Sequence, residues 1–252
     1  MQSLQTVPAL PYTVEKWETY ERSYTVDPVR GEFRKTEIPH NVNIYGKQTR
    51  PWKSAARMKN EFLTLQFIRQ FTNIPVPKPI YMEELDGAMS IVVEYIPGVP
   101  LDELPDTIRA TAVEKATRLI EDNVLPQLRK LTSRHNGSLS GEVISPRRVQ
   151  EESTKQEWSR IESLEPRFHF CHNDLAQHNI LCDPQSGEVL AIIDWEYAGY
   201  YESVFEKPFW LHPFHEHSID KEEISKLESL LSGTQSDREC AVLQDDHPQH
   251  ST

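Results

Sequence analysis

The sequence predicts an α+β protein with two lobes, of which the first carries β-strands and the second is mainly helical. A helical pattern over residues 54–71 precedes two strand-like segments, and the pattern changes to helix after Pro97. The chain has 252 residues, 37% of them hydrophobic, which is enough to bury a core. We therefore expect an N-terminal lobe over residues 1–96, a C-terminal lobe over 97–231 and a disordered tail over 232–252.

One helix and one strand pair are predicted in the N-terminal lobe. Residues 54–71 place apolar side chains at helical spacing without Gly or Pro, and Pro75 ends the pattern. A strand that begins at Lys78 and another that ends at Ile96 are joined by an acidic turn. Residues 1–36 show only weak periodicity, so no element is predicted for them. The β-lobe is therefore expected to be short or truncated.

Helices and a short hairpin are predicted in the C-terminal lobe. A helical pattern runs from Leu101 to Leu131, and a polar surface excursion with a short helical stretch follows over residues 132–166. A strand at residues 168–171 then leads into a polar loop, and a turn that ends at Gly187 joins the two strands of a hairpin. Acidic residues flank this hairpin on both sides.

The composition excludes several classes of protein. The formal net charge is −12, and like charges repel along the approach to nucleic acid or to an anionic membrane. Three cysteines are too few for a disulfide framework, so a reducing compartment is expected. The sequence shows no signal-peptide pattern and no apolar run long enough to span a bilayer. We expect a cytoplasmic monomer that binds neither nucleic acid nor membranes.

The clearest chemical pattern runs from His172 to Asn179. It has the form H-x-D-x-x-x-x-N with Asp174 in the third position, and Asp194 follows after the hairpin. Phosphoryl transfer requires a carboxylate that accepts a proton from the attacking hydroxyl. It also requires oxygen ligands for the Mg²⁺ that neutralises the phosphates, and an amide and a second carboxylate can supply them. The hairpin is expected to bring Asp194 beside Asn179.

Three further segments accompany this motif: I-P-V-P at residues 74–77, V-E-Y-I-P-G at 93–98 and I-D-W-E-Y-A-G at 193–199. Together the four segments resemble the aminoglycoside phosphotransferase and choline kinase group, including its fungal members. The resemblance covers residues 54–210. It implies a bilobal protein-kinase-like fold and the transfer of the γ-phosphate of ATP to a hydroxyl of a small-molecule acceptor.

The resemblance also implies roles for the residues of the motif. Asp174 would be the base, and His172 would stabilise the catalytic loop beside it. Asn179 and Asp194 would bind Mg²⁺. Taken singly, each of these side chains has an ordinary alternative as a turn or helix cap, because Asp and Asn readily accept hydrogen bonds from backbone amides.

The phosphate-contacting lysine is harder to identify. In kinases of this type a helix glutamate, for which Glu61 is the candidate, fixes that lysine. Asn43 stands where similar proteins have the lysine. Lys47 and Lys53 are the nearest substitutes, and we favour Lys47.

Adenine is expected at the junction of the two lobes. The resemblance implies pairing with backbone groups of Glu94 and Ile96, between apolar walls from Ile91 and Ile192. A glycine-rich phosphate loop is not recognisable in the sequence. The alternative to an active kinase is therefore a pseudokinase that serves as a binding or scaffold protein.

The acceptor site is the least determined part of the sequence. Glu202 and Glu206 follow the D-W-E segment and are candidates to line it, with ordinary surface acids as the alternative. A protein kinase is disfavoured, because no A-P-E segment or activation loop follows Asp194.

A zinc site is a competing use of the polar loop, since imidazole and thiolate groups suit zinc. The possible ligands are His169, Cys171, His172, Asp174, His178 and Cys182. Strand alternation sends His172 to the opposite face from His169 and Cys171, which disfavours such a cluster. The histidine-rich run at residues 212–217 is interpreted as a surface loop.

Overall fold

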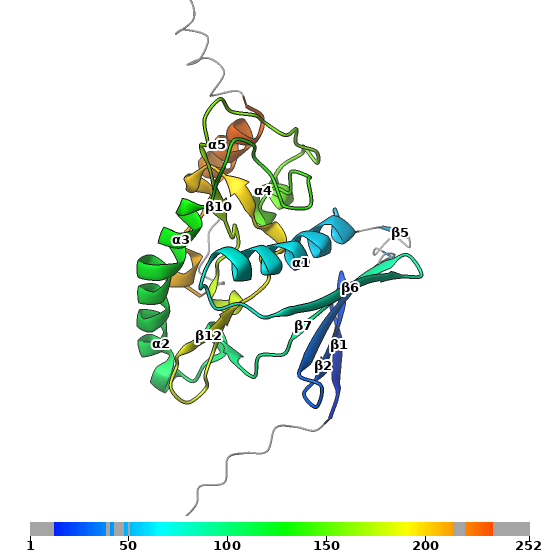
Figure 1. Cartoon of the computed structure of the whole chain (residues 1–252), viewed down its shortest axis with the longest axis vertical. Coiled ribbons are helices and arrows are strands. Elements are labelled where there is room, and N and C mark those ends of the chain that lie inside the picture. The colour runs from blue at the N-terminus through cyan, green and yellow to red at the C-terminus, as the bar shows by residue number, and fades with distance from the viewer. Residues whose placement is uncertain (1–12, 39–40, 43–47, 50, 214–219, 234–252) are drawn as a thin grey trace, which may run out of the picture.

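The computed structural model describes residues 13–38, 41–42, 48–49, 51–213 and 220–233. In this part of the chain a β-rich lobe and a larger, mainly helical lobe lie on either side of helix α1 (Ser54–Phe71), as Figure 1 shows. This arrangement confirms the α+β, two-lobed architecture that the sequence predicts.

A five-stranded antiparallel sheet forms the N-terminal lobe, in the order β1-β2-β3-β7-β6. Its strands are β1 (Glu15–Glu18), β2 (Arg22–Asp27), β3 (Glu32–Glu37), β6 (Pro79–Leu85) and β7 (Ala88–Glu94). The register places Lys35 of β3 opposite Tyr24 of β2 and Ile91 of β7. Strands β6 and β7 are the predicted strand pair, and α1 has the predicted bounds.

Three strands form where the sequence predicts none, between Glu15 and Glu37. Strand β3 reads Glu-Phe-Arg-Lys-Thr-Glu, so charged residues on both faces obscure the alternation that normally identifies a strand. Its neighbour β7 is apolar and buried along most of its length and supplies the paired edge on which β3 forms. The N-terminal lobe is therefore less abbreviated than the sequence indicates.

A two-stranded hairpin, β4 (Asn41–Val42) and β5 (Gln48–Thr49), connects β3 to α1. Asn43 and Lys47 lie outside the described residues, as do His215 and His217 and the greater part of the tail from residue 234 onward. The predictions made for these positions stay predictions.

The C-terminal lobe combines helices with two small sheets, in the orders β13-β10-β9 and β12-β11-β8. Its helical segments are η1 (Leu101–Glu103), α2 (Asp106–Leu119), the π-helical turn η2 (Ile120–Val124), α3 (Leu125–Lys130), α4 (Arg147–Glu152), η3 (Gln177–Asn179), η4 (Trp195–Tyr197), η5 (Ser203–Phe205), η6 (Phe209–Leu211) and α5 (Lys221–Leu231). Its strands are β8 (Val99–Pro100), β9 (Thr132–Ser133), β10 (Phe168–Cys171), β11 (Ile180–Cys182), β12 (Val189–Ile192) and β13 (Gly199–Tyr201). Among the described helices, none is long and apolar enough to cross a bilayer.

Helix α1 packs against both lobes and fixes them to each other. Its apolar residues Leu65 and Ile68 belong to the same core as Trp195 of η4. The buried Asn60 side chain donates hydrogen bonds to the carbonyl oxygens of Glu196 (3.1 Å) and Ala198 (2.8 Å). The two acidic loops, which contain Asp174 and Asp194, flank the strand pair β11 and β12. This strand pair lies next to the contact with Asn60. The position of α1 therefore depends on the loop that contains Asp194.

Candidate active site

A cavity of about 350 Å³ opens between the two lobes. Strands β1 to β3 cover it, and the chain segment that joins the lobes, residues 94–98, closes one side. Asn179 and Asp194 line it from the C-terminal lobe, and Lys35 and Glu61 line it from the N-terminal lobe. Four polar groups from four separate elements therefore meet in one mostly apolar cavity, which is the usual form of a small-molecule site.

Lys35 forms the centre of this polar group. Its Nζ lies 2.7 Å from a carboxylate oxygen of Glu61 and 2.7 Å from Oδ1 of Asp194, and its side chain is buried. Burial opposes the charge on Lys35, but Asp194 and Glu61 outweigh it and raise the pKa of the lysine well above its ordinary value. Lys35 is therefore a fixed cation that joins α1 to the loop after β12.

The two carboxylates beside Lys35 titrate in opposite directions. Burial favours the neutral form of Asp194, but the charge and hydrogen bond of Lys35 prevail and lower the pKa of Asp194. Burial raises the pKa of Glu61, and the charge of Lys35 only partly offsets this effect. Lys35 is therefore paired with both carboxylates, of which Asp194 is the more strongly ionised.

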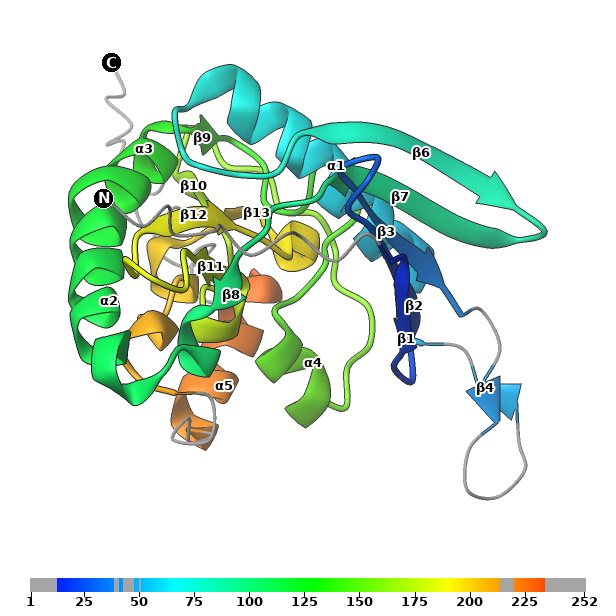
Figure 2. The same cartoon turned by 90° about the horizontal axis from the view of Figure 1, so that it is seen from below.

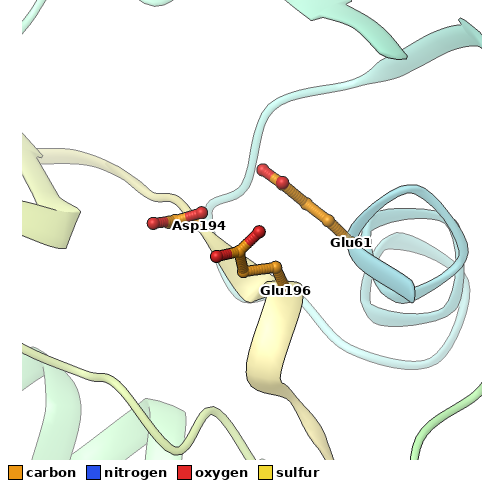
Figure 3. A group of neighbouring side chains, drawn as sticks. All are labelled: Glu61, Asp194 and Glu196. Carbon is orange, nitrogen blue, oxygen red and sulfur yellow. The ribbon is translucent and has the colours of Figure 1, made fainter. Parts of the chain in front are cut away.

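Glu196 completes a group of three carboxylates, shown in Figure 3 with Glu61 and Asp194. Glu196 accepts hydrogen bonds from two buried arginines, Arg57 at 2.9 Å and Arg22 at 3.3 Å. Its charge is therefore compensated within the protein, whereas Asp194 faces the cavity.

Both acidic loops contain a residue in the left-handed region of backbone conformation. Asn173 has φ of 69° and Asp194 has φ of 62°. Asn and Asp tolerate this region better than other residues with a side chain, but it still costs free energy that the surrounding structure must supply. The Asn173 side chain donates a 2.8 Å hydrogen bond to the carbonyl oxygen of Tyr197, which ties the first loop to the second.

Asn179 is oriented by the loop that it closes. Its Nδ2 donates to the carbonyl oxygen of Asp174 (2.8 Å) and more weakly to the Asp174 carboxylate (3.3 Å). The amide oxygen of Asn179 is thereby left to face other partners. The backbone N–H of Ile193 donates a 2.9 Å hydrogen bond to the backbone carbonyl oxygen of Asn179. Ile193 directly precedes Asp194, so this bond holds the Asp194 loop beside Asn179. An amide oxygen and a carboxylate that line one cavity are ligands of the kind that Mg²⁺ prefers.

Asp174 lies beside Asp194, Arg147 and Asn179. Burial raises the pKa of Asp174 to about 8, and the negative charge of Asp194 adds to the effect. Anything that neutralises Asp194 lowers the pKa of Asp174. A carboxylate with a raised pKa is typical of a group that exchanges protons. Asp174 itself does not line the cavity.

The buried ring of His172 connects the two acidic loops. Its Nδ1 accepts the backbone N–H of Asp174 (3.3 Å), and its Nε2 lies 3.0 Å from the carbonyl oxygen of Ile193, to which it donates. Acceptance at Nδ1 requires the neutral ring, and burial lowers the pKa of His172 to about 4. The sequence predicts this structural role from the resemblance, and the contacts support it.

His172 makes stability dependent on pH in the acid range. Its pKa is 6.5 in an unfolded chain and about 4 in the folded protein, so the unfolded chain binds the extra proton first as pH falls. His172 should therefore destabilise the protein by about 3 kcal/mol between pH 7 and pH 4. Denaturant unfolding of His172→Gln should lack this component, whereas His135→Gln, which replaces a half-buried histidine at the surface, should keep it. Equal pH dependence in wild type and His172→Gln would contradict the assignment.

The two candidate acceptor acids have other contacts. Glu206 is buried and accepts a hydrogen bond from the backbone N–H of His172, so it stabilises the catalytic loop. Burial raises the pKa of Glu206 to about 7, and the backbone amides of His172 and Asn173 only partly offset this. Glu202 forms an ion pair with Arg167. Neither glutamate lines the cavity that contains Asp194.

The segment that is predicted to bind adenine lines the cavity, but the two isoleucines that are predicted to form its walls do not. Glu94, Tyr95 and Ile96 line the cavity. Among the described residues, no group accepts a hydrogen bond from the backbone N–H of Ile96. Ile91 and Ile192 are buried in the core and do not line the cavity, so the expectation that they form its walls is wrong.

Aromatic rings cover the cavity in place of the predicted isoleucines. Trp17, Tyr24 and Phe33 project from β1, β2 and β3, with the Trp17 and Tyr24 rings stacked at 5.2 Å between centroids. Tyr24 and Phe33 lie 6.0 Å apart. The sequence does not predict these rings at the cavity, because residues 1–36 show only weak periodicity.

The zinc interpretation has no support in the described part of the chain. There, the one group of three or more possible metal-binding side chains within reach of each other consists of Glu61, Asp194 and Glu196, and it contains neither His nor Cys. The ring of His169 contacts the carbonyl oxygen of Arg129 instead.

Comparison with known proteins gives the family. The model of the phosphotransferase enzyme family, APH, matches residues 46–206. Human ethanolamine kinase 2 is 29% identical over 183 residues, which is 66% of this chain but 44% of that protein. The chain therefore spans less than half the length of this curated relative.

Solved structures of aminoglycoside phosphotransferases share the fold. A thermostable mutant of APH(4)-Ia, in its apo form, superposes with a TM-score of 0.52 at 13% identity, covering 77% of this chain and 70% of that one. APH(3'')-Id from Streptomyces rimosus gives a TM-score of 0.51 at 12% identity, covering 90% and 88%. These likenesses confirm the kinase-like fold, and the matched residues 46–206 include Asp174, Asn179 and Asp194. The chain belongs to the APH phosphotransferase enzyme family.

Proposed function

We propose that this protein transfers the γ-phosphate of ATP to a hydroxyl group of a small molecule. The observation that carries the proposal is the meeting of Lys35, Glu61, Asn179 and Asp194 in one cavity between the lobes. A cation for the phosphates, a glutamate that fixes it and two oxygen ligands for Mg²⁺ are the parts that phosphoryl transfer needs.

The apolar end of the cavity suits a nucleobase. The rings of Trp17, Tyr24 and Phe33 cover the cavity from the sheet and offer flat surfaces on which a base can stack. The N–H of Ile96, for which the described residues offer no acceptor, supplies a donor at the lobe junction, in keeping with the role that the resemblance implies for Ile96 and Glu94.

We assign the phosphate-contacting role to Lys35 rather than to Lys47. Lys47 lies outside the described residues, whereas Lys35 already forms the ion pair with Glu61 that defines this lysine in kinases. Asn179 and Asp194 would hold Mg²⁺, which neutralises phosphate charge when bound. Asp174 would then accept the proton of the acceptor hydroxyl while that oxygen attacks the γ-phosphorus.

The nucleotide site can be tested by thermal unfolding with and without Mg-ATP. Bound nucleotide stabilises the folded protein, by about 2.7 kcal/mol when its concentration is 100 times Kd. Lys35→Ala should abolish this stabilisation, because the variant lacks the cation that contacts the phosphates. Lys59→Ala, an exposed lysine of the same α1 to which Glu61 belongs, is the matched control and should respond like wild type.

A pseudokinase is the second candidate. The turn that joins β1 to β2, residues 19–21, contains no glycine, so a backbone cradle for phosphate is not evident there. If wild type shows no Mg-ATP stabilisation, the kinase proposal fails and this alternative replaces it. Ethanolamine, which the name of the human relative gives as its substrate, belongs in the first acceptor screen.

We also infer a reducing, cytoplasmic location and a monomeric state. The reducing environment is supported by Cys171 and Cys182, which are buried and free of disulfide bonds. Burial raises the pKa of the Cys171 thiol well above its ordinary value, so this thiol is not reactive.

A further inference from the structure

A second cavity, of about 380 Å³, adjoins the nucleotide cavity on the far side of Lys35 and Asp194. The turn between β1 and β2, the beginning of α1, helix α4 and the D-W-E segment line it. Figure 2 shows α4 between the body of the C-terminal lobe and strands β1 and β2. The two cavities share Tyr24, Lys35 and Asp194, so they meet where the terminal phosphate of a bound nucleotide would lie.

This position suits the acceptor. In-line transfer requires the acceptor on the side of the γ-phosphorus opposite the leaving group, and the nucleotide cavity already contains the leaving group. Arg147 of α4 lines the second cavity and lies within range of charge interaction with Asp174, the proposed base. The volume falls within the usual range for sites that bind small molecules.

The inner charges of this cavity are balanced. Four cationic side chains and four carboxylates line it. Arg57 and Arg22 are both paired with Glu196, at 2.9 and 3.3 Å. Arg57 is also paired with Glu21. An anionic or cationic ligand would have to break one of these pairs and leave a partly buried charge without its partner, which is costly.

The charges at the mouth of the cavity are paired as well. Arg147 lies 2.7 Å from Glu151, one helical turn away on α4. Such a pair presents donors and acceptors side by side, which matches neighbouring hydroxyl groups better than it matches a single charge.

The remaining lining residues are uncharged and add flat aromatic surface. Tyr20 of the β1–β2 turn and Trp52, just before α1, both line the cavity, and Gln150 of α4 adds an amide. An amide donates and accepts hydrogen bonds, and aromatic faces pack against the C–H faces of a ring. A compact, uncharged ligand with several hydroxyl groups fits this combination.

We propose that the second cavity is the acceptor site and that it takes a neutral polyhydroxylated molecule, a polyol or an unaminated sugar. The proposal rests on the proposed kinase function. In the transfer step a hydroxyl oxygen of the acceptor forms a bond to the γ-phosphorus of ATP, and the bond from that phosphorus to the bridging oxygen of ADP breaks. The hydroxyl proton goes to the Asp174 carboxylate, and ADP leaves with the electron pair.

Matched pairs of acceptors test the charge preference. Each pair consists of a neutral compound and its aminated counterpart, such as glucose with glucosamine and ethylene glycol with ethanolamine, and product formation from ATP and Mg²⁺ is measured. Neutral compounds should react with a kcat/KM at least tenfold above their aminated partners. A preference for the aminated partners would overturn the proposal, and the kinase function would stand.

Two variants test the location. Gln150→Ala and Tyr20→Ala should each raise the KM for the preferred acceptor about tenfold and leave the KM for ATP unchanged. Both positions are at the protein surface or half-buried, so the fold should tolerate the changes. Glu152→Ala is the control, because Glu152 lies on α4 outside the cavity. An unchanged acceptor KM in both variants would place the acceptor elsewhere, whereas a wild-type protein that Mg-ATP does not stabilise would overturn the kinase function itself.

Discussion

Replacing Asp174 with alanine should lower the rate of phosphoryl transfer by about 10²- to 10⁴-fold, the range typical of a lost general base. The carboxylate is buried, and the negative charge of Asp194 contributes to its raised pKa of about 8. Mg²⁺ bound at Asp194 would offset that charge and leave Asp174 ionised, so that it can accept the hydroxyl proton. The measurement is kcat for transfer from ATP to an acceptor found in the screen. Asp122→Ala, which removes an exposed acid of the same lobe, should leave kcat unchanged.

Nucleotide binding separates Asp174 from Asp194. Asp174→Ala should keep most of the thermal stabilisation by Mg-ATP, because Asp174 does not line the nucleotide cavity. Asp194→Ala should lose both the stabilisation and the transfer, since it removes the proposed metal ligand and the partner of Lys35. A fully active Asp174→Ala protein would disprove the base assignment, and unaffected nucleotide binding in Asp194→Ala would disprove the metal assignment.

Local sequence patterns predict the C-terminal half of the site well. The spacing from His172 to Asn179 and the hairpin up to Asp194 depend on short-range geometry, and the structure brings these residues to neighbouring loops. Helix α1, with Glu61 on its buried face, follows from apolar periodicity within a single element. Chemistry that is contained in one continuous segment can be inferred without the tertiary structure.

Lys35 could not be predicted in this way, because its role depends on partners that are distant in sequence. Its strand has charged residues on both faces, and only pairing with β7 and contact with Glu61 and Asp194 distinguish Lys35 from Arg34. One signal was present in the sequence: Phe33 and Lys35 are two residues apart, so a strand places this aromatic residue and this lysine on the same face. Glu206 was predicted at the acceptor site, and its contact with the backbone N–H of His172 was missed for the same reason, since that contact is a property of the assembled lobe.

The second large expected effect is a loss of stability on replacement of Arg57. Arg57→Met should lower the free energy of unfolding by about 3 to 5 kcal/mol, because it leaves Glu196 buried with one of its two arginine partners removed. Glu196 and Glu21 outweigh the burial of Arg57 and raise the pKa of its guanidinium, so this cation is charged at every accessible pH. Denaturant unfolding of purified protein gives the comparison with wild type.

The double variant Arg57→Met with Glu196→Gln decides whether the loss comes from an uncompensated charge. If the charge of Glu196 causes the loss, the neutral amide should restore part of the stability, since its oxygen can still accept a hydrogen bond from the buried Arg22. If Arg57 instead contributes mainly by packing on the Tyr197 ring, 5.4 Å from its guanidinium, the double variant should be at least as unstable as the single one. Recovery would mean that the uncompensated charge of Glu196 causes the instability, and it should be accompanied by restored Mg-ATP stabilisation, because Glu61 and Asp194 reach Lys35 only when α1 and the Asp194 loop are correctly placed.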